Sequence, residues 1–271
     1  MIKKKISFPD PSMDDKRIPT LDVYPNFQQR LSDKRGFRRL LLTALPAIPR
    51  HAYHPFLHEV HNALCHLRSR PYRVLKAYSD RRNLLVNLGC GLAAKPGWVN
   101  VDMVRYPEVN YLFDCRKKLP FSDCSVRAIF TEHFIEHIDY CEEIPAFLSE
   151  CHRVLLPGGV IRIIVPDAEK YVRGYCSEDW CELSQIRPLG ADHSDSHFGT
   201  KYSTKMELLN VVFRQYFEHK FAYDFETLEF VLRRYGFSQV EHQKFGRSVL
   251  PELAIDNPSR ASESLYVEAV K

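Results

Sequence analysis

A strand, a glycine turn and a second strand that ends in an acid follow one another in the stretch NLLVNLGCGLAAKPGWVNVDM, residues 83–103. Glycine permits a positive φ and a close approach of the backbone, so Gly89 and Gly91 suit a turn that passes beneath a ligand. Asp102 closes the second strand, where a carboxylate can accept hydrogen bonds from both hydroxyls of a ribose. The stretch therefore predicts a pocket of the nucleotide-binding type.

The same stretch completes neither of two common phosphate-binding loops. A dinucleotide fingerprint reads GxGxxG and places its acid roughly twenty residues on, whereas Asp102 follows Gly91 by eleven residues. A Walker-type loop would need GK[ST], which is also missing. Because a GxG turn alone is weak evidence, the function must be read from the segments that follow it.

From Asn83 onward, short β-rich runs alternate with turns and helices, which predicts a mainly parallel α/β sheet. Apolar residues at helical spacing predict helices over 141–155 and 224–236, and PGG at 157–159 predicts a turn into the next strand. Residues 167–223 fit no compact strand–helix unit and are expected to be an insertion. The expected strands are 84–88, 98–101, 126–131, 159–165, 238–244 and 264–270, with a short one at 109–113.

Charge divides the chain into a basic arm and a mildly acidic body. Residues 1–82 hold 17 Lys+Arg against 7 Asp+Glu, and the remainder holds 21 against 27. Helices are expected in the arm from Phe27 to Tyr78. Proline should break them at Pro46, Pro49, Pro55 and Pro71. We therefore expect a basic helical extension over 1–80 and a second domain over 81–271.

The cysteines and the first residues indicate the compartment. The eight cysteines form no CxxC pair and no disulfide framework, which is typical of a reducing cytosol. The cationic start MIKKKISFPDPSMDD is followed by no apolar stretch, so a signal peptide is not expected. The most apolar early run, Leu40–Ile48, is interrupted by Pro46 and is too short to span a bilayer. The sequence predicts a soluble, cytoplasmic protein.

Four segments follow in order at compatible spacings: NLGCG, VNVDM, FDCRKKLPFSDCSVRAIFTEHFIEHI and FLSECHRVLLPGGVIRIIVPD. This ordered set resembles the class I S-adenosylmethionine-dependent methyltransferases, and more narrowly the branch associated with polysaccharide and lipopolysaccharide biosynthesis. The resemblance covers residues 83–170 strongly, 219–271 moderately and the N-terminal 80 residues not at all. It implies a doubly wound, mainly parallel, Rossmann-like sheet of seven strands, with the insertion after strand five.

The resemblance also implies a bound S-adenosylmethionine. Asp102 would hold its ribose, Asp114 its adenine amino group, and the end of strand four would face its sulfonium. For Asp114 the alternative is a solvated turn residue. The residues carried over to the cofactor site are Asn87, Gly89, Cys90, Gly91, Asp102, Met103, Asp114, Cys115, Thr131 and Glu132.

Two features depart from the class I pattern. Most members place an acid at the position of Asn87, and an amide there can bind a ligand but cannot balance an ammonium charge. The link AAKPGW is too short for the usual first crossover helix, a feature that the narrower branch shares.

Methyl transfer from a sulfonium needs alignment of acceptor, methyl group and sulfur, and a hydroxyl acceptor benefits from a general base. The candidates are His133 after strand four, Asp167 after strand five and His219 before the last large helix. His137 is a further candidate, although it could simply bond a carboxylate such as Glu136. Each could equally be a structural polar residue. We favour His219, because acceptor-side groups usually come from covering segments.

The loop DHSDSHFG, 192–199, offers His193, Asp195 and His197 as ligands for a divalent ion. Alternate residues in a polar loop are more typical of solvated turns, so no metal ion is expected here and the loop is read as part of a substrate cover.

These observations favour O-methylation of a sugar hydroxyl during surface-polysaccharide or glycolipid assembly. The basic runs KRGFRR, 34–39, and RSRPYR, 68–73, suggest an anionic membrane surface or a phosphorylated carrier as partner, at the inner face of the membrane. They are also compatible with a solvated helical face. RNA or another small molecule is the alternative acceptor, although no RNA-binding module is recognisable and TEHF stands where base-modifying enzymes carry a PPW-type tetrapeptide. A third reading is a non-catalytic cofactor-binding relative.

Overall fold

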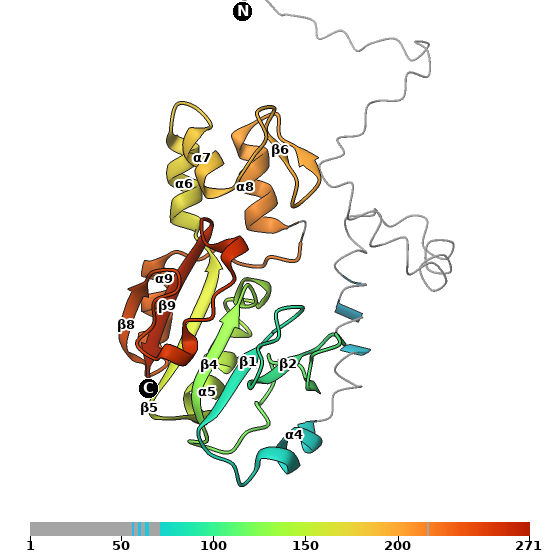
Figure 1. Cartoon of the computed structure of the whole chain (residues 1–271), viewed down its shortest axis with the longest axis vertical. Coiled ribbons are helices and arrows are strands. Elements are labelled where there is room, and N and C mark those ends of the chain that lie inside the picture. The colour runs from blue at the N-terminus through green and yellow to red at the C-terminus, as the bar shows by residue number, and fades with distance from the viewer. Residues whose placement is uncertain (1–55, 57–58, 61–62, 65–70, 216) are drawn as a thin grey trace, which may run out of the picture.

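The computed structural model describes residues 56, 59–60, 63–64, 71–215 and 217–271 (Figure 1). Its strands are β1 (Leu84–Leu88), β2 (Val99–Asp102), β3 (Tyr111–Leu112), β4 (Val126–Glu132), β5 (Leu155–Pro166), β6 (Ser194–Asp195), β7 (Thr200–Lys201), β8 (Ser238–Gln243) and β9 (Ser264–Val270). Its α-helices are α4 (Pro71–Tyr78), α5 (Ile144–Val154), α6 (Ala168–Cys176), α7 (Cys181–Ile186), α8 (Lys205–Arg214) and α9 (Phe225–Arg234). Three 3-10 helices are η1 (Ile135–His137), η2 (Pro251–Leu253) and η3 (Pro258–Arg260). The breaks expected at Pro46, Pro49 and Pro55 lie outside the described residues.

The main sheet has seven strands in the order β3-β2-β1-β4-β5-β9-β8. Strands β1 to β5 pair in parallel, whereas β9 runs antiparallel to both β5 and β8. The predicted mainly parallel sheet of seven strands, with a Rossmann-like strand order, is confirmed. Parallel pairing brings the carboxyl ends of β1, β2, β4 and β5 to one edge, where open α/β sheets bind their ligands.

The prediction of a turn at PGG, residues 157–159, is wrong, because these residues lie inside β5. Leu155 pairs with Val126 and Val160 pairs with Ala128, so the residues between them bulge out of the ladder. Gly158 in this bulge has a φ of +76°, a conformation that glycine adopts readily and other residues adopt only with strain. The strand therefore begins directly after α5, four residues earlier than the sequence indicated.

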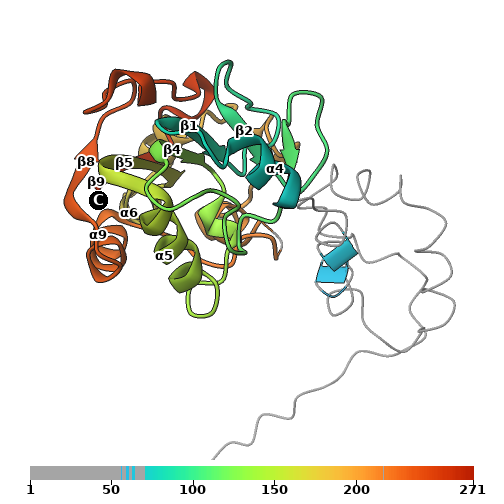
Figure 2. The same cartoon turned by 90° about the horizontal axis from the view of Figure 1, so that it is seen from below.

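The two faces of the sheet are covered differently. Helices α5 and α9 pack on one face, and the chain between β8 and β9, with η2, covers the other (Figure 2). The second face is packed around Trp98, Phe130 and Leu253, and contains no α-helix among its buried contacts within the described residues. This matches the short connection between β1 and β2, which has no crossover helix.

A buried ion cluster fastens the β8–β9 connection to the sheet. Arg162 on β5 is fully buried and donates to both oxygens of Asp256, at 2.7 and 2.6 Å, and to Glu268 Oε1 at 2.8 Å. Its guanidinium also donates to the carbonyl oxygens of Arg247 at 2.8 Å and Lys244 at 3.3 Å. Asp256, Arg247 and Lys244 lie in the connection and Glu268 lies on β9. One arginine therefore holds that segment on the face that lacks helices.

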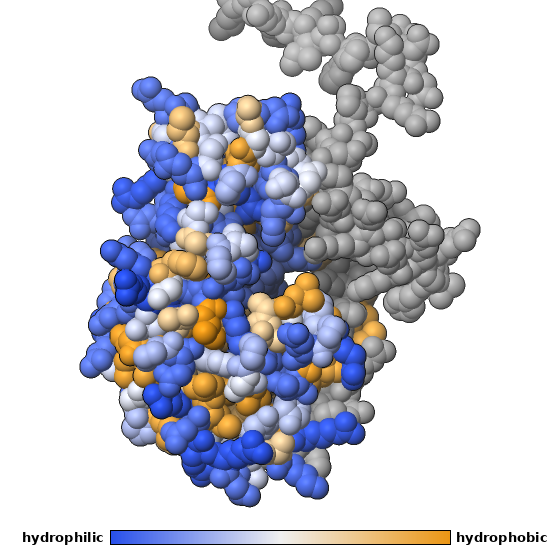
Figure 3. All heavy atoms as spheres, in the orientation of Figure 1, coloured by the Kyte–Doolittle hydropathy of each residue, from blue (hydrophilic) through white to orange (hydrophobic). Residues whose placement is uncertain are grey.

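The predicted insertion after β5 contains α6, α7, the β6–β7 hairpin and α8, which stand together beyond the end of β5 (Figure 1). It has a core of its own, centred on Tyr171, Leu183 and Leu208. In the view of Figure 3 the surface over these helices is mostly hydrophilic and its hydrophobic residues are scattered. Within the described ranges, no helix combines the length and the apolar character that crossing a membrane requires.

Candidate active site

Asp102 ends β2, and its carboxylate already accepts two backbone hydrogen bonds. Gly91 N donates to Oδ2 at 2.8 Å and Val104 N donates to Oδ1 at 2.7 Å. Burial raises the pKa of Asp102, although these hydrogen bonds oppose the rise. A carboxylate offers about four acceptor positions, so two remain for the hydroxyls of a ribose. Asp102 thus shapes the glycine turn and also fits a diol, with the half-buried Met103 beside it.

Gly89 and Gly91 have positive φ values of +65° and +51°, but the space above them differs. A Cβ at Gly89 would clash with the ring of Phe134, whereas one at Gly91 would meet no atom within 4 Å. Phe134 therefore fills the space over Gly89, and the open approach to the backbone lies over Gly91. Cys90 between them is buried, and burial raises the pKa of its thiol to about 12, which makes it a packing residue.

Asn87 and Asn100 form a buried polar pair that holds the loop between β1 and β2. Asn87 Nδ2 donates to Asn100 Oδ1 at 3.1 Å and to Ala93 O at 3.2 Å. Asn100 accepts from Lys95 N at 2.7 Å and donates to Lys95 O at 2.9 Å. The amide N–H groups of Asn87 are therefore used to fix this loop, which has no crossover helix to support it.

Asp114 follows β3 and is bound by its neighbour Arg116. Arg116 Nε donates to Oδ1 at 3.0 Å and Nη2 donates to Oδ2 at 3.1 Å. Arg116 also reaches Glu143 Oε1 at 3.1 Å, which ties Asp114 to the start of α5. An adenine amino group at Asp114 would share the carboxylate with this arginine. The adjacent Cys115 is buried, and burial raises the pKa of its thiol well above its usual range.

The last residues of β4 present polar atoms at the same edge. Thr131 Oγ1 is buried and has no hydrogen-bond partner among the described residues. Glu132 Oε1 accepts from Asn257 N at 3.0 Å, and burial raises the pKa of this carboxyl. Both residues lie at the edge that the resemblance assigns to the sulfonium.

His133 has both ring nitrogens engaged. Arg260 Nη1 can only donate, so the 2.8 Å contact makes His133 Nδ1 an acceptor, and Nε2 is then left to donate to Ser264 Oγ at 2.9 Å. Burial lowers the pKa of His133 well below its ordinary value. The neutral ring thus joins the end of β4 to Arg260 and to Ser264 at the start of β9. Neither ring nitrogen has a lone pair left for a methyl acceptor.

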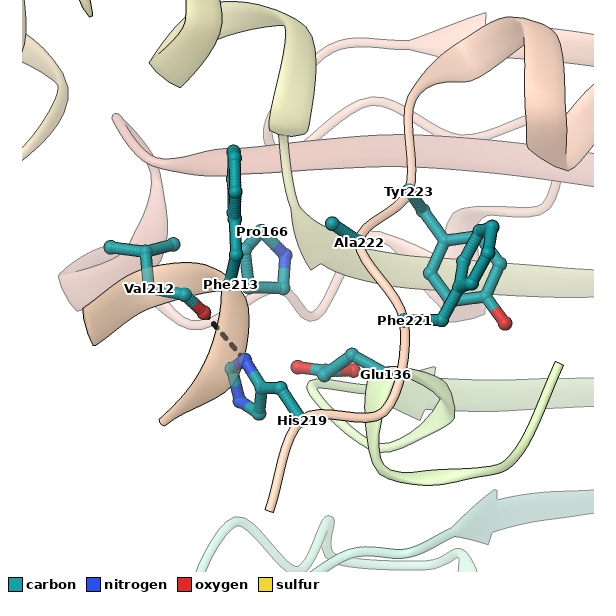
Figure 4. Close-up of a pocket in the computed structure, with 8 residues that line it drawn as sticks. All are labelled: Glu136, Pro166, Val212, Phe213, His219, Phe221, Ala222 and Tyr223. Carbon is teal, nitrogen blue, oxygen red and sulfur yellow. Dashed lines mark hydrogen bonds between the residues drawn. The ribbon is translucent and has the colours of Figure 1, made fainter. Parts of the chain in front are cut away.

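A small pocket lies where η1, the end of β5 and the segment after α8 meet (Figure 4). Its lining residues are Glu136, Pro166, Val212, Phe213, His219, Phe221, Ala222 and Tyr223. Figure 4 shows the Glu136 carboxylate directed toward the ring of His219. The sequence-predicted His219 thus meets an acid that sequence reasoning had considered only as a partner of His137.

Glu136 is 2% exposed, and neither of its carboxylate oxygens has a hydrogen-bond partner among the described residues. His133 Nδ1 lies 3.4 Å from Oε1, but that nitrogen already accepts from Arg260 and has no hydrogen to give. Burial raises the pKa of Glu136 to about 8. A buried carboxylate without a donor is costly, so its position needs a functional explanation.

His219 and His137 meet edge to face, with ring centroids 4.7 Å apart. His219 Nδ1 contacts Val212 O at 2.6 Å and His137 Nδ1 contacts Glu218 O at 3.1 Å. Burial, together with the neighbouring His137, lowers the pKa of His219 to about 3. The resting His219 ring is therefore neutral near pH 7.

Asp167, the third sequence candidate, caps a helix. Its Oδ1 accepts from Lys170 N at 3.3 Å at the start of α6, and its side chain is nearly buried. Its backbone N donates to Glu263 O at 3.0 Å, and Lys170 Nζ lies 3.6 Å from Oδ2. These contacts give Asp167 a structural task at the base of the insertion.

The loop residues His193, Asp195 and His197 are used for packing and ion pairing. Asp195 is the buried partner of Arg187 and also accepts from Tyr202 Oη at 3.0 Å. His193 stacks on Trp180 at 4.1 Å between ring centroids. Asp195 thus fastens the insertion hairpin.

Part of the chain matches a known protein family. Residues 89–163, from the glycine turn to β5, match a family described as "Methyltransferase domain". No curated protein sequence gives a significant match. Because the matched residues contain the turn, Asp102, Asp114 and the end of β4, the family match falls on the edge of the sheet described above.

Solved structures with a similar fold include two bacterial or archaeal S-adenosylmethionine-dependent methyltransferases. One, from Archaeoglobus fulgidus, is 19% identical with a TM-score of 0.43, over 81% of this chain and 100% of that one. Another, from Mesorhizobium loti, is 17% identical with a TM-score of 0.41, over 74% and 97%. A 1,6-didemethyltoxoflavin-N1-methyltransferase from Burkholderia thailandensis is 13% identical with a TM-score of 0.38, over 87% and 88%.

The sheet order, the glycine turn that ends on an acid-capped second strand and the family match agree with one another. Residues 89–163 therefore carry a methyltransferase domain on a Rossmann-like sheet, and the chain is an S-adenosylmethionine-dependent methyltransferase.

Proposed function

We propose that this methyltransferase acts on an oxygen acceptor, a sugar hydroxyl in surface-polysaccharide or glycolipid assembly. The observation that supports an oxygen acceptor is the meeting of Glu136 and His219 at one pocket. A hydroxyl carries a proton that must leave during transfer, and these two side chains are polar groups that can receive a hydrogen bond from it. The narrower choice of a sugar rests on the sequence resemblance.

The donor side follows from the glycine turn. The carboxylate of Asp102 would hold both ribose hydroxyls, and the backbone at Gly91 would lie beneath the methionine part, where no side chain fills the space. S-adenosylmethionine supplies an electrophilic methyl group on a sulfonium. The chain contributes alignment, which accounts for most of the rate in such in-line displacements.

On the acceptor side, the oxygen lone pair forms the new bond to the methyl carbon as the carbon–sulfur bond breaks, and that electron pair stays on sulfur. The hydroxyl proton passes to a group in the pocket. Of the four sequence candidates, His219 lines the pocket and His137 does not, whereas the nitrogens of His133 are engaged and Asp167 caps α6. His219 is therefore the group we place beside the acceptor.

The acceptor class can be tested directly. The purified chain is incubated with methyl-labelled S-adenosylmethionine and a panel of nucleotide-activated and lipid-linked sugars, with RNA as the competing acceptor. We expect label in a sugar methyl ether, located by NMR on the product. Label in an RNA base or in an amine, with none in any sugar, would contradict the proposal.

Replacing Asp102 by alanine should weaken donor binding. A hydrogen bond to an ionised group is worth on the order of 1.5–3 kcal/mol, and a loss of at least this size corresponds to roughly a ten- to hundredfold weaker complex. Calorimetry with S-adenosylhomocysteine measures the change. Asp192→Ala, on an exposed acid of the insertion, is the matched control and should bind normally. An unchanged dissociation constant in a folded Asp102→Ala chain would remove Asp102 from the donor site.

The basic arm leads to a proposal about place of action, at the inner face of a membrane. Residues 34–39 and 68–70 lie outside the described residues, and Arg73 is an exposed residue of α4, so this rests mainly on charge. Binding of the full chain to liposomes should require acidic lipid and should fade as salt rises. Neutralising Arg35, Arg38 and Arg39 should reduce it and leave donor affinity intact. Equal binding to neutral liposomes would show that charge is not the cause.

A further inference from the structure

Three possible ligand atoms converge beside the pocket. Glu136, His137 and His219 each offer one such atom, and these atoms all lie within 4.8 Å of one another. In a tetrahedral site, ligands held at about 2.1 Å from an ion lie roughly 3.4 Å apart, so side-chain rotations that bring the ligand atoms closer by up to about 1.4 Å would complete the site. The three residues come from η1 and from the segment after α8, more than eighty positions later in the chain.

Backbone hydrogen bonds fix these two segments against each other. Lys220 N donates to Glu136 O at 2.7 Å, and Phe221 N approaches the same oxygen at 3.3 Å. The residue before this pair is His219, and the residue after Glu136 is His137. The side chains of the cluster are therefore presented by a paired backbone and do not depend on a free loop.

The hydrogen bonds of the two imidazoles set their tautomers. A carbonyl oxygen can only accept, so His219 Nδ1 donates to Val212 O and His137 Nδ1 donates to Glu218 O. In each neutral ring the lone pair then lies on Nε2. Histidines that ligate a metal commonly donate their other ring N–H to a backbone carbonyl in this way, because it fixes the ring and raises its basicity.

The carboxylate supplies the second, independent observation. Glu136 is buried, it lines the pocket, and both of its oxygens are without a hydrogen-bond partner among the described residues. A cation bound in place of the acid's proton would pair with the carboxylate and satisfy its lone pairs. A bound cation would therefore explain why this carboxylate is buried without a hydrogen-bond donor.

We propose that Glu136, His137 and His219 form a binding site for one divalent first-row transition-metal ion. Two imidazoles and one carboxylate suit Zn²⁺, Co²⁺ or Fe²⁺, whereas Mg²⁺ and Ca²⁺ prefer sites made of oxygen atoms. Three protein ligands leave at least one coordination position open, and the adjoining pocket is where an acceptor oxygen would enter. An ion there would polarise that oxygen and lower the pKa of its hydroxyl. This role rests on the proposed function, but the binding of the ion does not.

Metal binding is tested on the full, tag-free chain. The chain is freed of metal with a chelator, which is then removed, and Co²⁺ is titrated while its visible absorption and the heat of binding are recorded. We expect one ion per chain, with little competition from Mg²⁺. Glu136→Gln and His219→Gln should each weaken the binding at least about 100-fold, since loss of a ligand should exceed the 10–100-fold effect of losing its outer-shell partner. His242→Gln, on an exposed histidine of β8, is the matched control and should bind normally.

The exposed thiols of Cys141, Cys176 and Cys181 could also bind Co²⁺, but they are unchanged in every variant, so the difference between variants reports the cluster alone. Equal Co²⁺ affinity in the unmodified chain and in a folded Glu136→Gln chain would overturn the proposal, as would the absence of binding at millimolar Co²⁺. If the ion binds but no sugar is methylated, the acceptor assignment fails and the metal site stands. If sugars are methylated at full rate by the metal-free chain, the proposed role of the ion fails.

Discussion

Replacing His219 by alanine is expected to lower turnover by roughly 10²–10⁴-fold while leaving donor affinity within about twofold of normal. The ring lies beside Glu136 at the acceptor pocket, whose lining residues include none from the Asp102 turn, so its loss should affect the chemical step and spare donor binding. The same loss of turnover is expected whether the ring receives the hydroxyl proton or helps to bind a metal ion. Turnover is measured as release of S-adenosylhomocysteine with the acceptor found above, and donor affinity by calorimetry.

Folding has to be controlled in this experiment, because His219→Ala also removes the hydrogen bond to Val212 O. His219→Gln restores a donor near that carbonyl and should be equally impaired in turnover if the imidazole is needed. His242→Ala should retain full activity, since that exposed ring only stacks on Phe225. Normal turnover of a folded His219→Ala chain would remove this residue from the acceptor site.

Replacing Arg162 by methionine should destabilise the fold by about 3–5 kcal/mol, because it leaves Asp256 and Glu268 buried without their cation. The loss should appear as a lower urea midpoint with an unchanged m-value. Replacing all three members of the cluster, as Arg162→Met, Asp256→Leu and Glu268→Met, should restore much of the stability, since no buried charge then remains.

The control for this prediction is Arg127→Met on the neighbouring strand β4. Arg127 is 46% exposed at its side chain and pairs with Glu252 at the surface, so its replacement should cost about 1 kcal/mol or less. Similar midpoints for Arg162→Met and Arg127→Met would show that the buried cluster does not hold the β8–β9 connection.

The strands could be predicted where one face or both faces are apolar over a continuous run. LLVNL and SLYVEAV were placed with the bounds that the structure has, because buried strands read as unbroken apolar segments. The start of β5 could not be predicted, since PGG is a turn signal in isolation. Only pairing with β4 and β9, which the sequence does not reveal, makes it a bulge within a strand.

The donor side of the site could be predicted from the sequence because its residues lie close together in the chain. Gly91 and Asp102 bracket one short loop, and their hydrogen bond closes that loop. The role of Asn87 in holding the loop could not be predicted, because its partner Asn100 becomes a neighbour only when β1 and β2 pair. The same holds for Arg116, which binds Asp114 and also reaches Glu143, a residue distant in the sequence.

The acceptor side depended on contacts between distant segments. HFIEH, residues 133–137, carries an acid and two histidines, but the sequence does not tell which of them turn toward His219. The structure turns Glu136 and His137 toward it, and Arg260 occupies His133. Carbonyl partners such as Val212 O have no side-chain signature at all, so the tautomers could be assigned only from the fold.

The central claim is that this chain is a methyltransferase that uses S-adenosylmethionine. Its most direct test is native mass spectrometry of the full chain with S-adenosylmethionine and, separately, with S-adenosylhomocysteine. The account predicts one added ligand mass per chain for each compound, and a much smaller bound fraction for the Asp102→Ala chain at the same ligand concentration. A folded chain that takes up neither compound at about 1 mM, where even a complex of only about −4.1 kcal/mol would be half formed, would contradict it.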